Sequence, residues 1–96
     1  MNPPLAQLHA FVEGTVQGVG FRAYVADRAE FLGLTGWVRN TLNGEVEVLA
    51  EGSRADLDIL YQALLKGPRG SFVAGIRTQY GPHSGQYADF SIERTI

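Results

Sequence analysis

The residues with the clearest chemical potential lie between positions 14 and 22, in the sequence Gly-Thr-Val-Gln-Gly-Val-Gly-Phe-Arg. Three glycines within seven positions let the backbone turn tightly and bring its N–H groups close to a ligand. Arg22 stands where a helix is expected to begin, and a helix N-terminus attracts anions through its unpaired N–H groups and its dipole. Backbone amides together with a guanidinium therefore favour a tetrahedral oxyanion such as phosphate.

The same glycines match parts of other motifs. Residues 18–23 fit the pattern Gly-x-Gly-x-x-Gly/Ala of dinucleotide-binding folds, which also needs an acidic residue about 20 positions later and a large parallel sheet. The next expected strand ends instead at Asn40, and a chain of 96 residues is too short for that sheet. A Walker-type loop is excluded because no Gly-Lys-Ser/Thr follows the glycines. Spacing alone also allows a tight turn with a surface arginine.

The remaining titratable residues do not suggest a second site. The two histidines lack the spacing of metal ligands, and the absence of cysteine excludes disulfides, thiolate metal sites and cysteine nucleophiles. We therefore expect no metal and no cofactor. We expect His9 to be a strand residue and His83 a loop residue. We expect the acidic side chains to lie on solvated faces: Asp56, Asp58, Glu45, Glu47 and Glu51.

These residues must be positioned by secondary structure, which the hydrophobic periodicity predicts. The expected strands are residues 8–13, 35–41, 45–51, 71–80 and a short last strand at 87–93, with helices over 22–32 and from a cap at Ser53 to about Lys66. Asn43-Gly44 is typical of a type I′ hairpin turn. The order predicts an α+β, ferredoxin-like βαββαβ sandwich, with two helices on one face of an antiparallel or mixed sheet of four to five strands.

This topology brings distant residues together. The first two strands are joined through a helix and should run parallel, so their C-terminal ends should lie at one edge of the sheet. We therefore expect Arg22 and Asn40 at the same rim. An arginine and an asparagine beside free amides suit a reaction that needs little acid–base help, such as hydrolysis of an acyl phosphate, whose carboxylate leaves without protonation.

The bulk composition limits the partners. We expect a single domain over residues 1–96 with a frayed terminus at 1–6. A net charge of −2 and a pI of about 5.5 argue against nucleic acid and anionic membranes. Neither a signal peptide nor an apolar stretch long enough to span a membrane is present, so we expect a soluble cytoplasmic monomer.

Two segments of the sequence resemble the signatures of a known family. Residues 14–22 are similar to the first signature of the acylphosphatases. Residues 36–46, Gly-Trp-Val-Arg-Asn-Thr-Leu-Asn-Gly-Glu-Val, continuing to Gly52, are similar to the second. The resemblance covers essentially the whole chain, is weakest over residues 67–89, and points to the small single-domain enzymes of bacteria and archaea.

The resemblance implies a metal-independent hydrolase that acts on small acyl phosphates, such as acetyl or carbamoyl phosphate. Arg22 would bind the phosphoryl group, and Asn40 would position the attacking water through its side-chain amide. Inorganic phosphate or sulfate would bind as a product-like ligand. The phosphate would be cradled by the backbone amides of Gln17, Gly18, Val19, Gly20, Phe21 and Arg22.

Two other functions remain to be weighed. One is a non-catalytic acylphosphatase-like module that binds phosphate or carbamoyl phosphate, as related domains do inside larger maturation enzymes. The other is an RNA-binding ferredoxin-like domain, which should carry stacking aromatic residues in a basic sheet. The strand at 45–51 has three glutamates and no aromatic residue, which argues against RNA.

Overall fold

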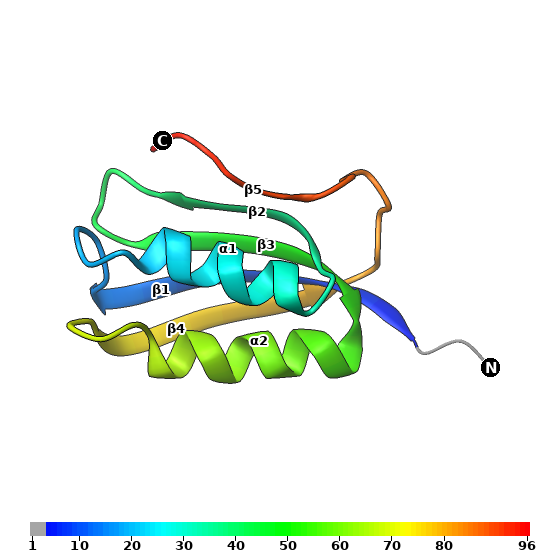
Figure 1. The fold of residues 1–96 in the computed structure, drawn as a ribbon, viewed down its shortest axis with the longest axis horizontal. Helices are drawn as coiled ribbons and strands as arrows, with labels where there is room; N and C mark the ends of the chain where they lie inside the picture. Colours follow the sequence, from blue (N-terminus) through cyan, green and yellow to red (C-terminus); the bar gives the residue numbers. More distant parts are fainter. Residues whose placement is uncertain (1–3) are drawn as a thin grey trace.

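The computed structural model describes residues 4–96, which form five strands and two helices in the predicted order. Both helices pack on one face of the sheet (Figure 1). This arrangement confirms the predicted α+β, ferredoxin-like fold. The elements are β1 (Leu5–Thr15), α1 (Phe21–Phe31), β2 (Thr35–Asn40), β3 (Val46–Ser53), α2 (Arg54–Lys66), β4 (Phe72–Gly81) and β5 (Phe90–Ile92).

The strands form one mixed sheet in the order β4-β1-β3-β2-β5. The pairs β4–β1, β1–β3 and β3–β2 are antiparallel, and β5 lies parallel to β2 at the edge. Because β3 is antiparallel to both β1 and β2, these two strands run in the same direction. Their ends are in register, since Val46 of β3 pairs with Val12 on one side and with Asn40 on the other.

The core lies between the sheet and the helices. Alternate residues of the strands point toward the helices, which is the period-2 pattern of a half-buried sheet. Apolar side chains at helical spacing cover them from α1 and α2. The most buried of these residues are Leu8, Ala10, Val12, Val38, Val46, Val48 and Ala50 of the strands, and Phe21, Val25, Ala29, Leu57, Leu60 and Leu64 of the helices.

Some predicted boundaries were wrong. Strand β1 begins at Leu5, which pairs with Ser53, so the expected fraying through residue 6 does not extend to residues 5 and 6; residues 1–3 lie outside the described part of the chain. The last strand covers only residues 90–92. Both differences reflect pairing partners far away in sequence, which local patterns do not reveal.

The turn between β2 and β3 is also not the expected type I′ turn. That turn requires positive φ at both central residues, whereas Gly44 has a φ of 92° and no described residue other than glycine has a positive φ. Instead, the Gly44 N–H donates to the Thr41 carbonyl, and the Thr41 N–H donates to the Glu45 carbonyl. The connection is therefore longer, with glycine alone in the left-handed region.

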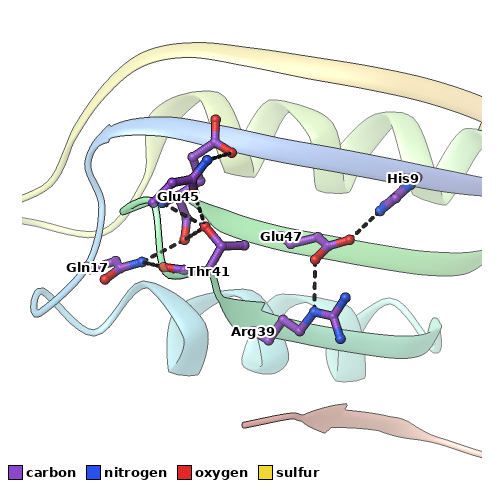
Figure 2. A network of polar contacts seen from close by, with 7 residues as sticks. His9, Gln17, Arg39, Thr41, Glu45 and Glu47 are labelled. Atoms are coloured by element: carbon purple, nitrogen blue, oxygen red, sulfur yellow. Dashed lines mark hydrogen bonds and ion pairs between the residues drawn. The ribbon is translucent and has the colours of Figure 1, made fainter. Parts of the chain in front are cut away.

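The outer face of the sheet is less exposed to solvent than predicted. The three glutamates of the third strand segment were expected to be solvated, but Glu45, Glu47 and Glu51 are only 8%, 6% and 1% exposed. Each is buried under polar partners. Arg77 donates to Glu45. His9 and Arg39 contact Glu47 (Figure 2).

Glu51 has the most complete set of partners. Its carboxylate accepts hydrogen bonds from the Gln7 side chain, from the N–H and hydroxyl of Ser84 and from the Gly85 N–H, at 2.7 to 3.0 Å. Burial alone would raise the pKa of Glu51, but these hydrogen bonds outweigh it and lower the pKa to about 2. The side chain therefore fastens the connection between β4 and β5 to the sheet as a carboxylate.

Candidate active site

The segment between β1 and α1 turns sharply through two glycines. Gly18 and Gly20 have φ values of 75° and 78°, in the left-handed region that L-residues with a side chain avoid. No heavy atom lies within 4 Å of a Cβ built on either glycine, so both face open space. Gly20 is also the N-cap of α1, and no side chain caps the helix there.

The amides of this segment are free. Within residues 4–96, no backbone carbonyl accepts a hydrogen bond from the N–H groups of residues 17–22. The first N–H in α1 with a backbone partner is that of Tyr24, which donates to the Gly20 carbonyl at 3.0 Å. A run of unpaired N–H groups at a helix N-terminus is the local arrangement that binds anions.

A cavity of about 260 Å³ opens beside this segment and brings the two predicted side chains together. Arg22, on the first turn of α1, and Asn40, the last residue of β2, both line it, together with Gly18 and Gly20. Within residues 4–96, Arg22 has no ion-pair partner, so its guanidinium is available to an anion. Arg22 and Asn40, 18 positions apart in sequence, therefore share one site.

Asn40 has an unusual environment. Its Oδ1 is the one buried side-chain oxygen or nitrogen among the described residues that has no hydrogen-bond partner. A buried amide oxygen without a partner is costly. Asn40 also lines the cavity, so this unsatisfied group belongs to a residue at the wall of the candidate site.

The sequence matches one protein family over nearly the whole chain. The family model named Acylphosphatase matches residues 8–92. The chain belongs to the acylphosphatase family. A curated acylphosphatase from Anaeromyxobacter sp. (strain Fw109-5) is 43% identical over 88 residues, which cover 92% of this chain and 95% of the relative.

Solved structures agree with this membership. The acylphosphatase from Bacillus subtilis superposes with a TM-score of 0.89 and 38% identity, covering 92% of this chain and 98% of the other. Full-length HypF, in a phosphate- and nucleotide-bound form, contains a similar region with a TM-score of 0.88 and 26% identity. That match covers 99% of this chain but only 13% of HypF.

Of the six residues whose amides were predicted to cradle phosphate in this acylphosphatase, Gly18, Gly20, Phe21 and Arg22 line the cavity. Val19 instead packs against the core, while Phe21 is itself a core residue and only 2% exposed, so apolar side chains anchor both the loop and the start of α1. Gln17 turns its side chain toward the connection between β2 and β3 (Figure 2).

Sequence reasoning missed three lining residues, Val16, Ala23 and Ile92. Val16 and Ala23 flank the predicted segment and could have been included from their position alone. Ile92 comes from β5, where it pairs with Val38 of β2, and it reaches the site only because β5 adds to the sheet in parallel. No local signal in the sequence around residue 92 indicates that contact.

Within residues 4–96, no group of three His, Cys, Asp or Glu side chains is arranged to hold a metal ion. The helices of this part of the chain are also too short or too polar to cross a membrane.

Proposed function

We propose that this acylphosphatase hydrolyses the carboxyl–phosphate bond of small acyl phosphates, giving a carboxylate and inorganic phosphate, with Arg22 and Asn40 as its catalytic side chains. Membership of the family and the names of its relatives support the activity. The observation that supports the roles is the meeting, at one cavity, of Arg22, whose guanidinium has no ion-pair partner among the described residues, of Asn40 at the end of β2, and of a run of unpaired backbone N–H groups.

In this mechanism the phosphoryl group sits against the backbone amides of Gln17, Gly18, Val19, Gly20, Phe21 and Arg22. The Arg22 guanidinium binds its oxygens and stabilises the charge that they carry in the transition state. The side-chain amide of Asn40 hydrogen-bonds to a water and holds it for in-line attack on phosphorus. Positioning and charge stabilisation supply most of the catalysis when the phosphoryl transition state is loose.

The chemistry of the leaving group explains why so few side chains suffice. A carboxylate is stable near neutral pH, so the departing oxygen needs no proton from a general acid. None of the residues that line the cavity is acidic or a histidine, which agrees with a mechanism that uses no general acid or base. The proposed mechanism also needs no metal, so activity should persist in EDTA.

The experiment that tests these roles measures hydrolysis of benzoyl and acetyl phosphate, in the presence of EDTA, by the wild type and three variants. Asn40→Ala should lower kcat by about 10²- to 10³-fold, the range measured for loss of one positioned polar group. Its Ki for inorganic phosphate should stay close to that of the wild type. Arg22→Ala should lower kcat/KM at least as much and should also raise the Ki for phosphate.

Arg69→Ala is the matched control, because Arg69 is exposed and does not line the cavity. Near-wild-type turnover by the Arg22 or Asn40 variant would refute the assigned roles. Phosphate binding without any turnover by the wild type would instead favour the non-catalytic module. That alternative is not favoured here, since identity to the acylphosphatase relative is 43% and to HypF 26%.

We also propose that the chain acts as a single-domain monomer on acetyl phosphate, carbamoyl phosphate or a similar small substrate. Light scattering across a concentration series tests the oligomeric state. Comparing kcat/KM for acetyl and carbamoyl phosphate tests the substrate range.

A further inference from the structure

The side chain of Gln17 joins the loop before α1 to the connection between β2 and β3 (Figure 2). Its Nε2 donates hydrogen bonds to the carbonyl oxygens of Thr41 and Glu45, both at 2.8 Å. Gln17 is half-buried, so water competes only partly for these bonds. Two well-formed bonds from one amide group fix the position of the loop relative to the other segment.

The chemistry of the two partners determines which residue can stand at this position. Both are carbonyl oxygens, which only accept, so the NH₂ end of the carboxamide must face them. An ionised carboxylate of the same shape would place a negative charge against two acceptors and could form neither bond. A thioether of similar length would fill the space without donating.

Both carbonyls belong to the connection just beyond Asn40 and Val46, the last pair of β2 and β3. Thr41 directly follows Asn40, and Glu45 directly precedes Val46, the residue that pairs with Asn40. The Thr41 and Glu45 backbones are also bonded to each other, because the Thr41 N–H donates to the Glu45 carbonyl at 2.9 Å and the Thr41 hydroxyl accepts from the Glu45 N–H at 3.1 Å. Gln17 therefore holds a connection that is already rigid.

We propose that Gln17 is a positioning residue whose carboxamide sets the separation between the phosphate-binding amides and the Asn40 side chain. This inference rests on the proposed function, in which these two parts hold the phosphoryl group and the attacking water. Without these two bonds, the loop can shift as one unit, with its amides and Arg22, relative to Asn40. A phosphate bound to the loop then keeps its contacts, while the water held by Asn40 leaves the line of attack. A misplacement of about 1 Å can cost about 100-fold in rate.

The prediction is a separation of kcat from phosphate affinity, with a pH signature. At pH 7, both Gln17→Glu and Gln17→Met should lower kcat tenfold or more, because a misplacement of about 1 Å can cost about 100-fold in rate. The Ki for inorganic phosphate should change by less than about threefold, which is less than the change expected from the loss of one hydrogen bond to a charged group. As pH falls toward 5, Gln17→Glu should regain activity relative to Gln17→Met, because the protonated carboxyl donates one O–H to a carbonyl.

The groups around the loop also titrate or carry charge, and the comparison accounts for them. They are Glu13 on β1, Arg22 on α1, Glu45 before β3 and Arg77 on β4, with Arg77 paired to both glutamates. Both Gln17 variants retain all four groups, so the ratio of their activities reports the introduced carboxyl alone. Gln62→Glu, on the exposed face of α2, is the control for adding a carboxylate and should follow the wild type at each pH.

The experiment measures kcat for benzoyl phosphate from pH 5 to 8, the Ki for phosphate, and unfolding in urea for each variant. Equal pH profiles for Gln17→Glu and Gln17→Met would overturn the proposal, as would a parallel loss of phosphate affinity and kcat. If Gln17→Glu is unfolded at pH 7, the split between kcat and Ki in Gln17→Met decides, and unfolding of both variants makes Gln17 structural and also overturns the proposal. An inactive wild type would refute the proposed function itself.

Discussion

Replacing Glu51 with glutamine should expose how strongly this carboxylate fastens the connection between β4 and β5. The substitution keeps the shape of the side chain and removes its charge. An amide has only one acceptor oxygen, so its NH₂ group must face either the Gly85 N–H or the donors of Ser84 and Gln7. At least one donor that now bonds to the carboxylate would lose its acceptor inside the protein.

The size of the effect follows from the pKa of Glu51. Hydrogen bonds hold it at about 2 in the folded protein, against an ordinary value of 4.5. A difference of about 2.5 units corresponds to about 3 kcal/mol of folding free energy, which is present in full above the ordinary pKa. It is lost as pH falls through the folded pKa, because the protonated carboxyl no longer gains from its donors. Glu51→Gln should therefore be about 3 kcal/mol less stable at pH 7, a drop in Tm of roughly 10 to 20 °C for a domain of this size.

The assay is urea unfolding at pH 7 and pH 3, followed by circular dichroism. The difference between wild type and Glu51→Gln should narrow by about 2 kcal/mol at pH 3, since most of the carboxylate contribution is then lost. Glu30→Gln, on the exposed surface of α1, should match the wild type at both pH values. A difference that is independent of pH, or smaller than about 1 kcal/mol at pH 7, would refute the view that the Ser84 and Gly85 donors stabilise a buried carboxylate.

Three further predictions concern the glycines and the bound anion. Gly36→Ala should prevent stable folding, measured by circular dichroism, because its Cβ would overlap the backbone carbonyl of Leu49 and its φ is 131°. Gly20→Ala should cost only about 1 to 2 kcal/mol in urea unfolding, since a Cβ there meets open space and the strain of a left-handed residue is the main penalty. Inorganic phosphate or sulfate at about 100 times its Kd should stabilise the wild type by about 2.7 kcal/mol, and the same concentration should stabilise Arg22→Ala much less, as measured by Tm; an equal shift would place the anion elsewhere.

Local sequence signals predicted most of the fold. Ser53 was expected to cap the second helix, and its hydroxyl accepts the Asp56 N–H at 3.1 Å. The alternation of Val46, Val48 and Ala50 correctly identified the face of β3 that belongs to the hydrophobic core. These features depend on hydrogen bonds and periodicities within a few residues, which a single sequence displays directly.

The outer face of the sheet could not be predicted in this way. A row of glutamates at alternate positions is typical of a solvated strand face, and nothing near them in sequence indicates burial. Each glutamate has at least one partner that is distant in sequence: Arg77 is 32 residues from Glu45, His9 is 38 from Glu47 and Ser84 is 33 from Glu51. Only the complete sheet brings those donors over β3.

The site was predictable where topology alone decides. Arg22 and Asn40 were expected at one rim because two parallel strands end at the same edge, and both line one cavity. The side-chain tie from Gln17 and the contribution of Ile92 were not predicted. Each depends on the exact path of a loop or of an edge strand, which the pattern of apolar residues leaves open.

The position of β1 in the sheet has a consequence for synthesis on the ribosome. One edge of β1 is covered by β3, but the other is covered only by β4, whose residues 72–81 emerge long after residues 5–15. Until then the nascent chain exposes a long strand edge whose unpaired N–H and C=O groups can form hydrogen bonds with a strand of another chain. We therefore expect this protein to acquire its native state in one late cooperative step, and to need protection from self-association while it is translated.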